Sequence, residues 1–289
     1  MKAIARRLVA VGLWSLCAGA SAQDDLLDLL GPVETPDAPV TATFKDTRII
    51  NGQSNETPAS GVLHFVIAHR FGQISDGAYD LWGLDNASMR MGFDYGITDR
   101  LAVGVARNTF QKTYEASVKA RLLRQSGTVP LSITGYSALA CNGLRWTEPD
   151  RENFFSSRLS YTHQLVIARK FSSNFSAALT PSVVHRNLVA TPQDAHDEFL
   201  IGAGGRYKVT NRVSVNGEYF LRLNPSEAYN NSLSLGVDIE TGGHVFQLHM
   251  TNSRGMFERA FLTETAGMWS DGNIYFGFNL SRVFTVSDR

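Results

Sequence analysis

The chain reads Tyr-Gly-Ile-Thr-Asp-Arg-Leu-Ala-Val at residues 95–103 and Tyr-Lys-Val-Thr-Asn-Arg-Val-Ser-Val at residues 207–215. A looser copy, Lys-Phe-Ser-Ser-Asn-Phe-Ser-Ala, occupies residues 170–177. In each copy a short Thr/Ser and Asp/Asn turn joins two runs in which apolar residues alternate with small or charged ones. Asp and Asn suit such turns because they tolerate left-handed backbone and hydrogen-bond their own turn. Repeated antiparallel hairpins of this kind predict an all-β fold, a sheet that closes on itself as an up-and-down β-barrel.

Similar alternating runs continue on both sides of these hairpins. They predict strands at about residues 43–50, 62–71, 87–97, 101–110, 113–123, 131–141, 157–171, 175–189, 198–209, 213–223, 232–240, 244–251 and 273–283. We interpret the first as an N-terminal lead-in. The other twelve form an even number of strands, as bacterial outer-membrane barrels usually have.

The predicted connections are of two lengths that mostly alternate. Short turns fall at 98–100, 125–130, 172–174, 210–212 and 241–243, and longer loops at 72–86, 142–156, 190–197, 224–231 and 253–272. The short link at 111–112 is the exception on the long-loop side. Short turns at one rim and long loops at the other are typical of transmembrane barrels, with the short turns in the periplasm. This orientation places both termini in the periplasm.

The alternation separates an apolar face from a charged one. The apolar face includes Val103, Leu165 and Leu235. The charged face carries Arg70, Arg90, Asp94, Glu115, Lys119, Arg121, Arg158, Arg186, Glu198, Arg206, Lys208, Glu218, Arg222, Asp238 and Glu240. A soluble lipocalin-like barrel would place the apolar face inside, around a ligand. A ring of twelve strands is wide and hard to fill with side chains, so we predict instead that the apolar face contacts lipid and the charged face lines the lumen.

The first 22 residues resemble a secretory signal peptide. Lys2, Arg6 and Arg7 precede an apolar stretch at 8–16, and Ala-Ser-Ala at 20–22 forms a cleavage site. The apolar stretch is shorter than the roughly 20 residues that a membrane-spanning helix needs. Cys17 leaves a lipoprotein signal as an alternative, although Leu16 before it is a poor fit. Cleavage would leave Cys141 as the only cysteine, a packed small residue or a reactive thiol.

Residues 23–42 are predicted to form a periplasmic extension. An acidic, leucine-rich segment at 24–30 is followed by Pro32, Pro36 and Pro39, which stiffen the linker. The segment is either a loose terminus or a short helix that docks on a periplasmic partner or on the barrel mouth. The barrel domain then covers residues 43–289.

Charge and composition restrict the partners. The mature chain would carry 24 basic and 27 acidic residues, a net charge of −3, which predicts no nucleic-acid partner. The expected partners are outer-membrane lipid and the outer-membrane assembly machinery. No cofactor is predicted.

The histidines do not form a recognisable metal or catalytic motif. His64 and His69, like His244 and His249, are five residues apart and therefore point to opposite faces of a strand. His163 lies on the apolar face, where some outer-membrane barrels hydrolyse lipids with a Ser-His pair, but no serine stands two positions from it. The glycines at 202–205 lie within a strand with no helix after them, so close packing explains them better than phosphate binding.

Several stretches resemble one bacterial β-barrel family, known as domain of unknown function 5777. They are Ala-Thr-Phe-Lys at 42–45, Arg-Ile-Ile-Asn at 48–51, His-Arg-Phe-Gly at 69–72, Thr-Gly-Gly-His-Val-Phe-Gln-Leu-His at 241–249, Thr-Asn-Ser at 251–253 and Gly-Phe-Asn-Leu-Ser-Arg-Val-Phe at 277–284. The resemblance covers residues 40–285 or so. It implies an outer-membrane barrel and brings no reaction, ligand or catalytic residue with it.

Three functions are compatible with these observations. The first is a narrow pore for small solutes, whose charged lumen would weakly favour anions. The second is a non-conducting structural or partner-binding barrel, because opposite charges interleaved on one face can pair and close the lumen. The third, an outer-membrane lipid hydrolase, lacks its motif, and we predict that the protein is not an enzyme.

Overall fold

A computed structural model describes residues 38–224 and 228–287. Residues 39–289 form one compact unit. The predicted signal peptide, Cys17 and the acidic segment at 24–30 lie outside the described residues.

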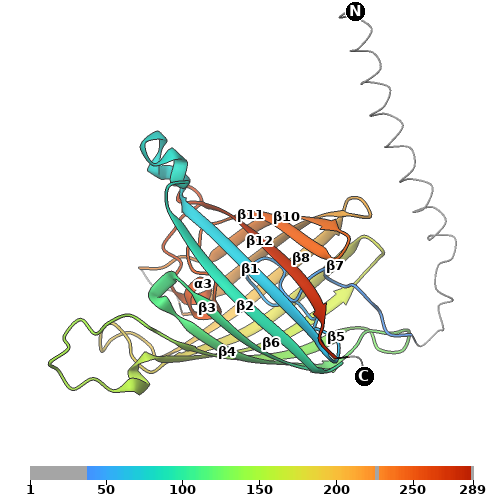
Figure 1. The fold of residues 1–289 in the computed structure, drawn as a ribbon, viewed down its shortest axis with the longest axis horizontal. Coiled ribbons are helices and arrows are strands. Elements are labelled where there is room, and N and C mark those ends of the chain that lie inside the picture. The colour runs from blue at the N-terminus through green and yellow to red at the C-terminus, as the bar shows by residue number, and fades with distance from the viewer. Residues whose placement is uncertain (1–37, 225–227, 288–289) are drawn as a thin grey trace, which may run out of the picture. The chain divides into compact units, whose positions relative to one another are not determined.

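Twelve antiparallel strands form a closed barrel in which each strand pairs with its neighbours in the sequence and β1 pairs with β12. Figure 1 shows the strands as one tilted ring. The strands are β1 (Val62–Gln73), β2 (Ala87–Thr98), β3 (Leu101–Asn108), β4 (Tyr114–Leu123), β5 (Ser132–Cys141), β6 (Leu159–Lys170), β7 (Phe175–Arg186), β8 (Asp197–Lys208), β9 (Val213–Arg222), β10 (Ser232–Thr241), β11 (His244–Thr251) and β12 (Tyr275–Thr285). The predicted fold is thereby confirmed.

Short helical turns occur only in the connections among the described residues. They are η1 (Ile74–Asp76), η2 (Ala78–Gly83), η3 (Phe110–Lys112), η4 (Phe155–Arg158) and α3 (Glu258–Thr263). None of these helices has the length and apolar character to cross a membrane.

Side-chain exposure alternates along most of the strands and assigns the two faces. On β3, Val103 and Val105 are exposed, whereas Ala102 before them, Gly104 between them and Ala106 after them are buried. Val105 on the outer face is 61 % exposed, whereas Arg70 on the inner face is 0 % exposed. Large apolar side chains therefore cover the outside of the wall, and the polar face points inward.

The predicted strand at 43–50 is wrong. Residues 43–58 instead form a folded segment inside the barrel, called here the inner segment (Figure 1). Arg48 and Gln53 form an isolated antiparallel bridge, and Ile49 donates a backbone hydrogen bond to the carbonyl of Gly52 at 2.8 Å. The alternation in the sequence had the period of a strand, but here the backbone turns back on itself and finds its polar partners on the barrel wall.

The predicted outer loop at 253–272 also differs from the structure. Part of it turns inward and places α3 against β6, β7 and β9. Its Phe261 and Leu262 pack with Val184, Leu200 and Phe220 of the wall. These side chains are apolar and the bilayer lies on the other side of the wall, so burial inside the barrel removes them from water.

Candidate functional site: the occupied lumen

Glu218 of β9 holds the inner segment at its centre. Its carboxylate accepts three backbone N–H groups in a row, from Ile50 at 3.2 Å, Asn51 at 2.8 Å and Gly52 at 2.9 Å. Glu218 is only 3 % exposed, so these bonds replace the water that the carboxylate would otherwise bind. Gly52 has no side chain, and this allows the approach, because a Cβ there would stand 2.5 Å from the Phe220 ring.

Asn51 connects the tip of the inner segment to both sides of the wall. Its side-chain amide donates to Ser234 Oγ at 2.9 Å, and its side-chain oxygen accepts from Arg70 Nη2 at 2.8 Å. Arg70 also donates to the carbonyls of Ser253 and Gly255 at 2.7 and 3.1 Å. One buried guanidinium thus joins β1, the inner segment and the loop that carries α3.

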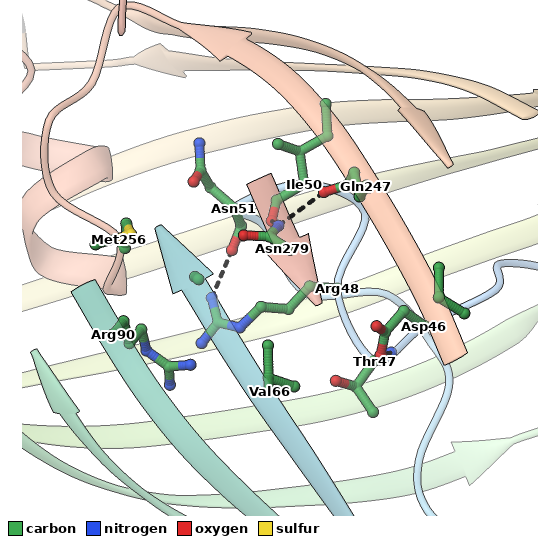
Figure 2. Close-up of a pocket in the computed structure, with 12 residues that line it drawn as sticks. Asp46, Thr47, Arg48, Ile50, Asn51, Val66, Arg90, Gln247, Met256 and Asn279 are labelled. Carbon is green, nitrogen blue, oxygen red and sulfur yellow. Dashed lines mark hydrogen bonds between the residues drawn. The ribbon is translucent and has the colours of Figure 1, made fainter. Parts of the chain in front are cut away.

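Side chains of β11 and β12 also contact the inner segment (Figure 2). Gln247 donates to the carbonyl of Ile49 at 2.7 Å, and Asn279 donates to the carbonyl of Ile50 at 3.2 Å. Asp238 accepts from Gln247 at 2.6 Å and therefore orients it. These side chains therefore supply hydrogen bonds to backbone carbonyls of the inner segment, which is not paired in the sheet.

The inner segment also contacts β1, β4 and α3. Lys119 donates to the carbonyl of Thr47 at 2.7 Å, and His64 Nε2 lies 2.8 Å from Asp46 Oδ1. Arg48 pairs with Glu258 of α3 at 2.8 Å. The contacts come from all round the barrel, so the segment lies within the lumen and not beside it.

Apolar packing accompanies the polar contacts. Phe44 and Ile49 of the inner segment pack against Val166, Ala168 and Ala178 on β6 and β7. Two enclosed spaces beside the segment measure about 20 and 10 Å³. Each has room for roughly one water molecule. The middle of the lumen is therefore filled.

A larger hollow of about 390 Å³ lies beside the first residues of the inner segment. It is lined by Lys45 and Glu56, by His64 of β1 and by His244 and Arg282 of β11 and β12. The hollow lies at the end of the barrel that carries the short turns, because Gly243 of the β10–β11 turn also lines it.

A family model described as a membrane bound beta barrel domain (DUF5777) matches residues 44–284. The chain belongs to this family. The membership confirms the resemblance seen in the sequence. A closed β-barrel with an apolar outer face is the form in which strands cross bacterial outer membranes. The DUF5777 chain is accordingly an outer-membrane β-barrel whose outer face contacts lipid.

Solved structures of similar fold include outer-membrane porins. A NanC porin in a rhombohedral crystal form is 7 % identical, with a TM-score of 0.49 over 77 % of this chain and 98 % of that one. A KdgM porin is 9 % identical, with a TM-score of 0.47 over 77 % and 99 %. An outer membrane channel from Pseudomonas putida F1 is 12 % identical, with a TM-score of 0.46 over 78 % and 96 %. No curated protein matches the chain.

Five of the fifteen charged residues predicted to line the lumen of the DUF5777 barrel bind the inner segment directly. They are Arg70, Lys119, Glu218, Glu240, which pairs with Lys45, and Arg121, which pairs with Glu56 at 3.4 Å. A solute in the middle of the lumen would have to displace the inner segment to reach most of these five residues.

The remaining charged residues contact one another, other side chains of the wall, or the rims. Arg90 and Glu115 form a bidentate pair at 2.8–3.1 Å, and Glu198 pairs with both Arg186 and Arg222. Arg206 donates to Ser214 at 3.0 Å, and Asp94 lies 3.7 Å from His64. Arg158 donates to the carbonyl of Asn142 at the long-loop rim, and Lys208 is half-buried near the short-turn rim. Their predicted role, lining a path for solute, stays a prediction.

Sequence reasoning missed the inner segment, α3 and Ser137 of β5, whose Oγ lies 2.9 Å from His163 Nδ1. The spacing of Phe257, Ala260 and Phe261, three and four residues apart, is a helical signal that the loop at 253–272 contained. No serine stands two positions from His163 along its own strand, whereas Ser137 stands opposite it on the neighbouring strand, β5.

Proposed function

We propose that this barrel is a solute passage that its own inner segment closes in the resting state. The three backbone bonds to Glu218 carry the proposal, because one carboxylate holds the turn of the segment across the lumen. Displacing the segment would expose the charged inner face to water and open a path.

The chemistry of the contact supports a removable plug. Most bonds between the segment and the wall involve amides, hydroxyls and charged groups, which water can also satisfy. Buried ion pairs and hydrogen bonds add little net free energy when solvent can replace both partners. A permanent filling would gain more from continuous apolar packing, which here is confined to residues such as Phe44 and Ile49.

The start of the inner segment supports a route for its removal. Val40 donates a backbone hydrogen bond at 2.7 Å to the carbonyl of Gln125, which lies in the β4–β5 turn. The chain therefore enters the lumen from the short-turn rim, which faces the periplasm by the general rule for such barrels. A periplasmic partner that binds the predicted extension at 23–42 would pull the inner segment out of the lumen from that side. Insertion of the barrel by the outer-membrane assembly machinery remains a prediction.

A non-conducting structural barrel is the second candidate. The small spaces beside the segment, about 20 and 10 Å³, favour it, because a space of this size holds roughly one water molecule and not a larger solute. The two proposals differ in what happens when the segment is released. A passage conducts when its plug is displaced, whereas a structural barrel loses stability without conducting.

Single-channel conductance in planar bilayers separates the two. We expect the wild type to be mostly silent and Glu218→Ala to conduct, because the Ala variant leaves three N–H groups without an acceptor. Glu152→Ala is the matched control, since Glu152 is exposed in a long loop. The released lumen should prefer anions at low salt and lose the preference at high salt, because nine of its fifteen predicted charges are basic.

A cross-linked plug makes the test sharper. Asn51→Cys with Ser234→Cys, in a Cys141→Ala background, places two thiols where side-chain atoms now lie 2.9 Å apart. We expect the cross-link to silence Glu218→Ala and a reductant to restore its current. If Glu218→Ala stays folded and silent with and without reductant, the structural barrel is correct and the passage is not.

A further inference from the structure

A serine and a histidine form a hydrogen-bonded pair on the lipid-facing side of the wall. Ser137 of β5 and His163 of β6 stand directly opposite each other in the strand register. Ser137 Oγ lies 2.9 Å from His163 Nδ1, and both side chains are exposed on the outer face. A polar pair exposed to the bilayer is unusual, because hydrocarbon offers it no hydrogen bonds.

The wall around this pair is hollowed. A groove of about 640 Å³ crosses the outer face, with Ser137 and His163 in its lining. Its lining includes three small residues, Ala120, Gly135 and Ser137. Gly135 has no side chain, and a Cβ at this position would have no heavy atom nearer than 3.9 Å among the atoms around it. Val118, Leu165 and Phe199 form apolar sides.

A proline interrupts the sheet beside the groove. Pro181 lies in the middle of β7 and has no N–H to donate to β6. Pairing of β6 with β7 runs to Gln164 and Ser182, lapses, and resumes at Ile167 and Leu179. Proline in a sheet is normally confined to edges or bulges. The interruption therefore begins two residues after His163.

The pair formed by Ser137 and His163 has hydrogen-bonding groups left without a partner among the described residues. A neutral imidazole has one donor and one acceptor nitrogen, and the serine hydroxyl both donates and accepts. Their mutual bond uses one donor and one acceptor, whichever tautomer is present. One donor and one acceptor remain, on two side chains that line the groove. A hydroxyl group on a ligand supplies the two missing partners, whereas a plain hydrocarbon chain supplies neither.

We propose that this groove binds a membrane lipid through an acyl chain that carries a hydroxyl group. The apolar sides accommodate the chain, and the pair formed by Ser137 and His163 binds its hydroxyl. Both residues stand four positions from the long-loop ends of their strands, at Cys141 and Leu159. Four residues span roughly 13 Å along a tilted strand. The hydroxyl therefore belongs near the start of an acyl chain in the leaflet on the long-loop side.

The pair is built to bind and not to hydrolyse. A catalytic serine–histidine pair needs a third group that orients the histidine through its other nitrogen. Among residues 38–224 and 228–287, the imidazole of His163 has Ser137 as its one hydrogen-bond partner. Without an orienting group, the imidazole is not held as a general base.

Lipid binding is tested by native mass spectrometry of the barrel purified from outer membranes. We expect the wild type to retain lipids with hydroxylated chains. Ser137→Ala and His163→Phe should each retain at least five-fold less of these lipids than the wild type. Gly135→Leu, which fills the groove, should lose it as well. Leu235→Ala, on the outer face of β10, is the matched control. Heat-modifiable migration on gels shows that each variant is folded.

A second measurement uses defined ligands. Delipidated barrel is titrated with 3-hydroxytetradecanoic acid and with tetradecanoic acid, which differ by one hydroxyl. We expect the wild type to prefer the hydroxylated acid at least five-fold and Ser137→Ala to bind both equally. Equal binding by the wild type would overturn the proposal. So would release of fatty acid from phospholipid vesicles that depends on Ser137, because that result would make the pair a hydrolase.

Discussion

Gly52 shows how one residue permits the plug to form. A side chain there would meet the Phe220 ring, so the backbone could not approach Glu218. We expect Gly52→Ala to lower the free energy of unfolding by about 1–3 kcal/mol, as overpacking usually does. Urea unfolding followed by heat-modifiable migration measures this. Gly205→Ala is the control, since the nearest atom would be 3.7 Å away. If both variants unfold alike, the close approach at Gly52 is not a constraint.

Asp46 makes the plug sensitive to acid. Burial opposes ionisation of Asp46, but the charge and hydrogen bond of His64 outweigh it and hold the pKa of the Asp46 carboxyl well below its usual range. A carboxyl whose pKa falls on folding stabilises the fold above its unfolded pKa, about 4, and loses that contribution as the pH falls through the folded value.

The expected result is that acid loosens the inner segment. Protease digestion of the segment should accelerate progressively below about pH 4 in the wild type, when an acid-stable protease is used. Asp46→Asn should digest faster near neutral pH and show a flatter pH dependence. A wild-type rate that is constant from neutral pH to about pH 2 would contradict this role of Asp46.

At the scale of single elements, the strands are defined by their two faces. Leu235 of β10 is 50 % exposed on the outer face. We expect Leu235→Arg to cost about 2–4 kcal/mol, because a charge then faces the hydrocarbon. Val286→Arg, just beyond β12, should cost only about 0–1 kcal/mol near the interface. Folding into lipid vesicles at graded urea concentrations measures both, and equal costs would mean that Leu235 does not face lipid.

The short helix α3 depends on the inner segment for its charge partners. Glu258 accepts from Gln53 at 2.7 Å and pairs with Arg48 at 2.8 Å, and it is 2 % exposed. Removing one member of a buried pair costs roughly 3–5 kcal/mol. We therefore expect Glu258→Gln to speed proteolysis of the loop at 253–272, and the added change Arg48→Met to restore much of the protection. Lack of any rescue would show that the two residues are not coupled.

At the scale of the whole molecule, the sequence predicted the wall and not its contents. Alternation with period two is a local property, so all twelve strands were predictable, and β11 was predicted with the bounds that it has. The inner segment depends instead on distant partners, since Glu218 stands 166–168 residues from the amides that it binds. No local pattern indicates such a pairing, and the alternation at 43–50 favoured a strand.

The same limit applies to the candidate sites. The charged residues could be assigned to the inner face from periodicity, but not to their partners, because Arg90 and Glu115 come from strands that are not adjacent. The pair formed by Ser137 and His163 depends on the register between β5 and β6, which the sequence does not specify.

The central claim is that the inner segment lies inside the barrel. Cysteine cross-linking in intact cells tests it most directly, with Asn51→Cys paired in turn with Ser234→Cys and with Leu235→Cys in the Cys141→Ala background. Ser234 faces inward and contacts Asn51, whereas Leu235, its neighbour, faces outward. We expect a short thiol cross-linker to join the first pair efficiently and the second hardly at all, as shown by gel mobility. Equal cross-linking of the two pairs, or none with Ser234→Cys, would contradict the account.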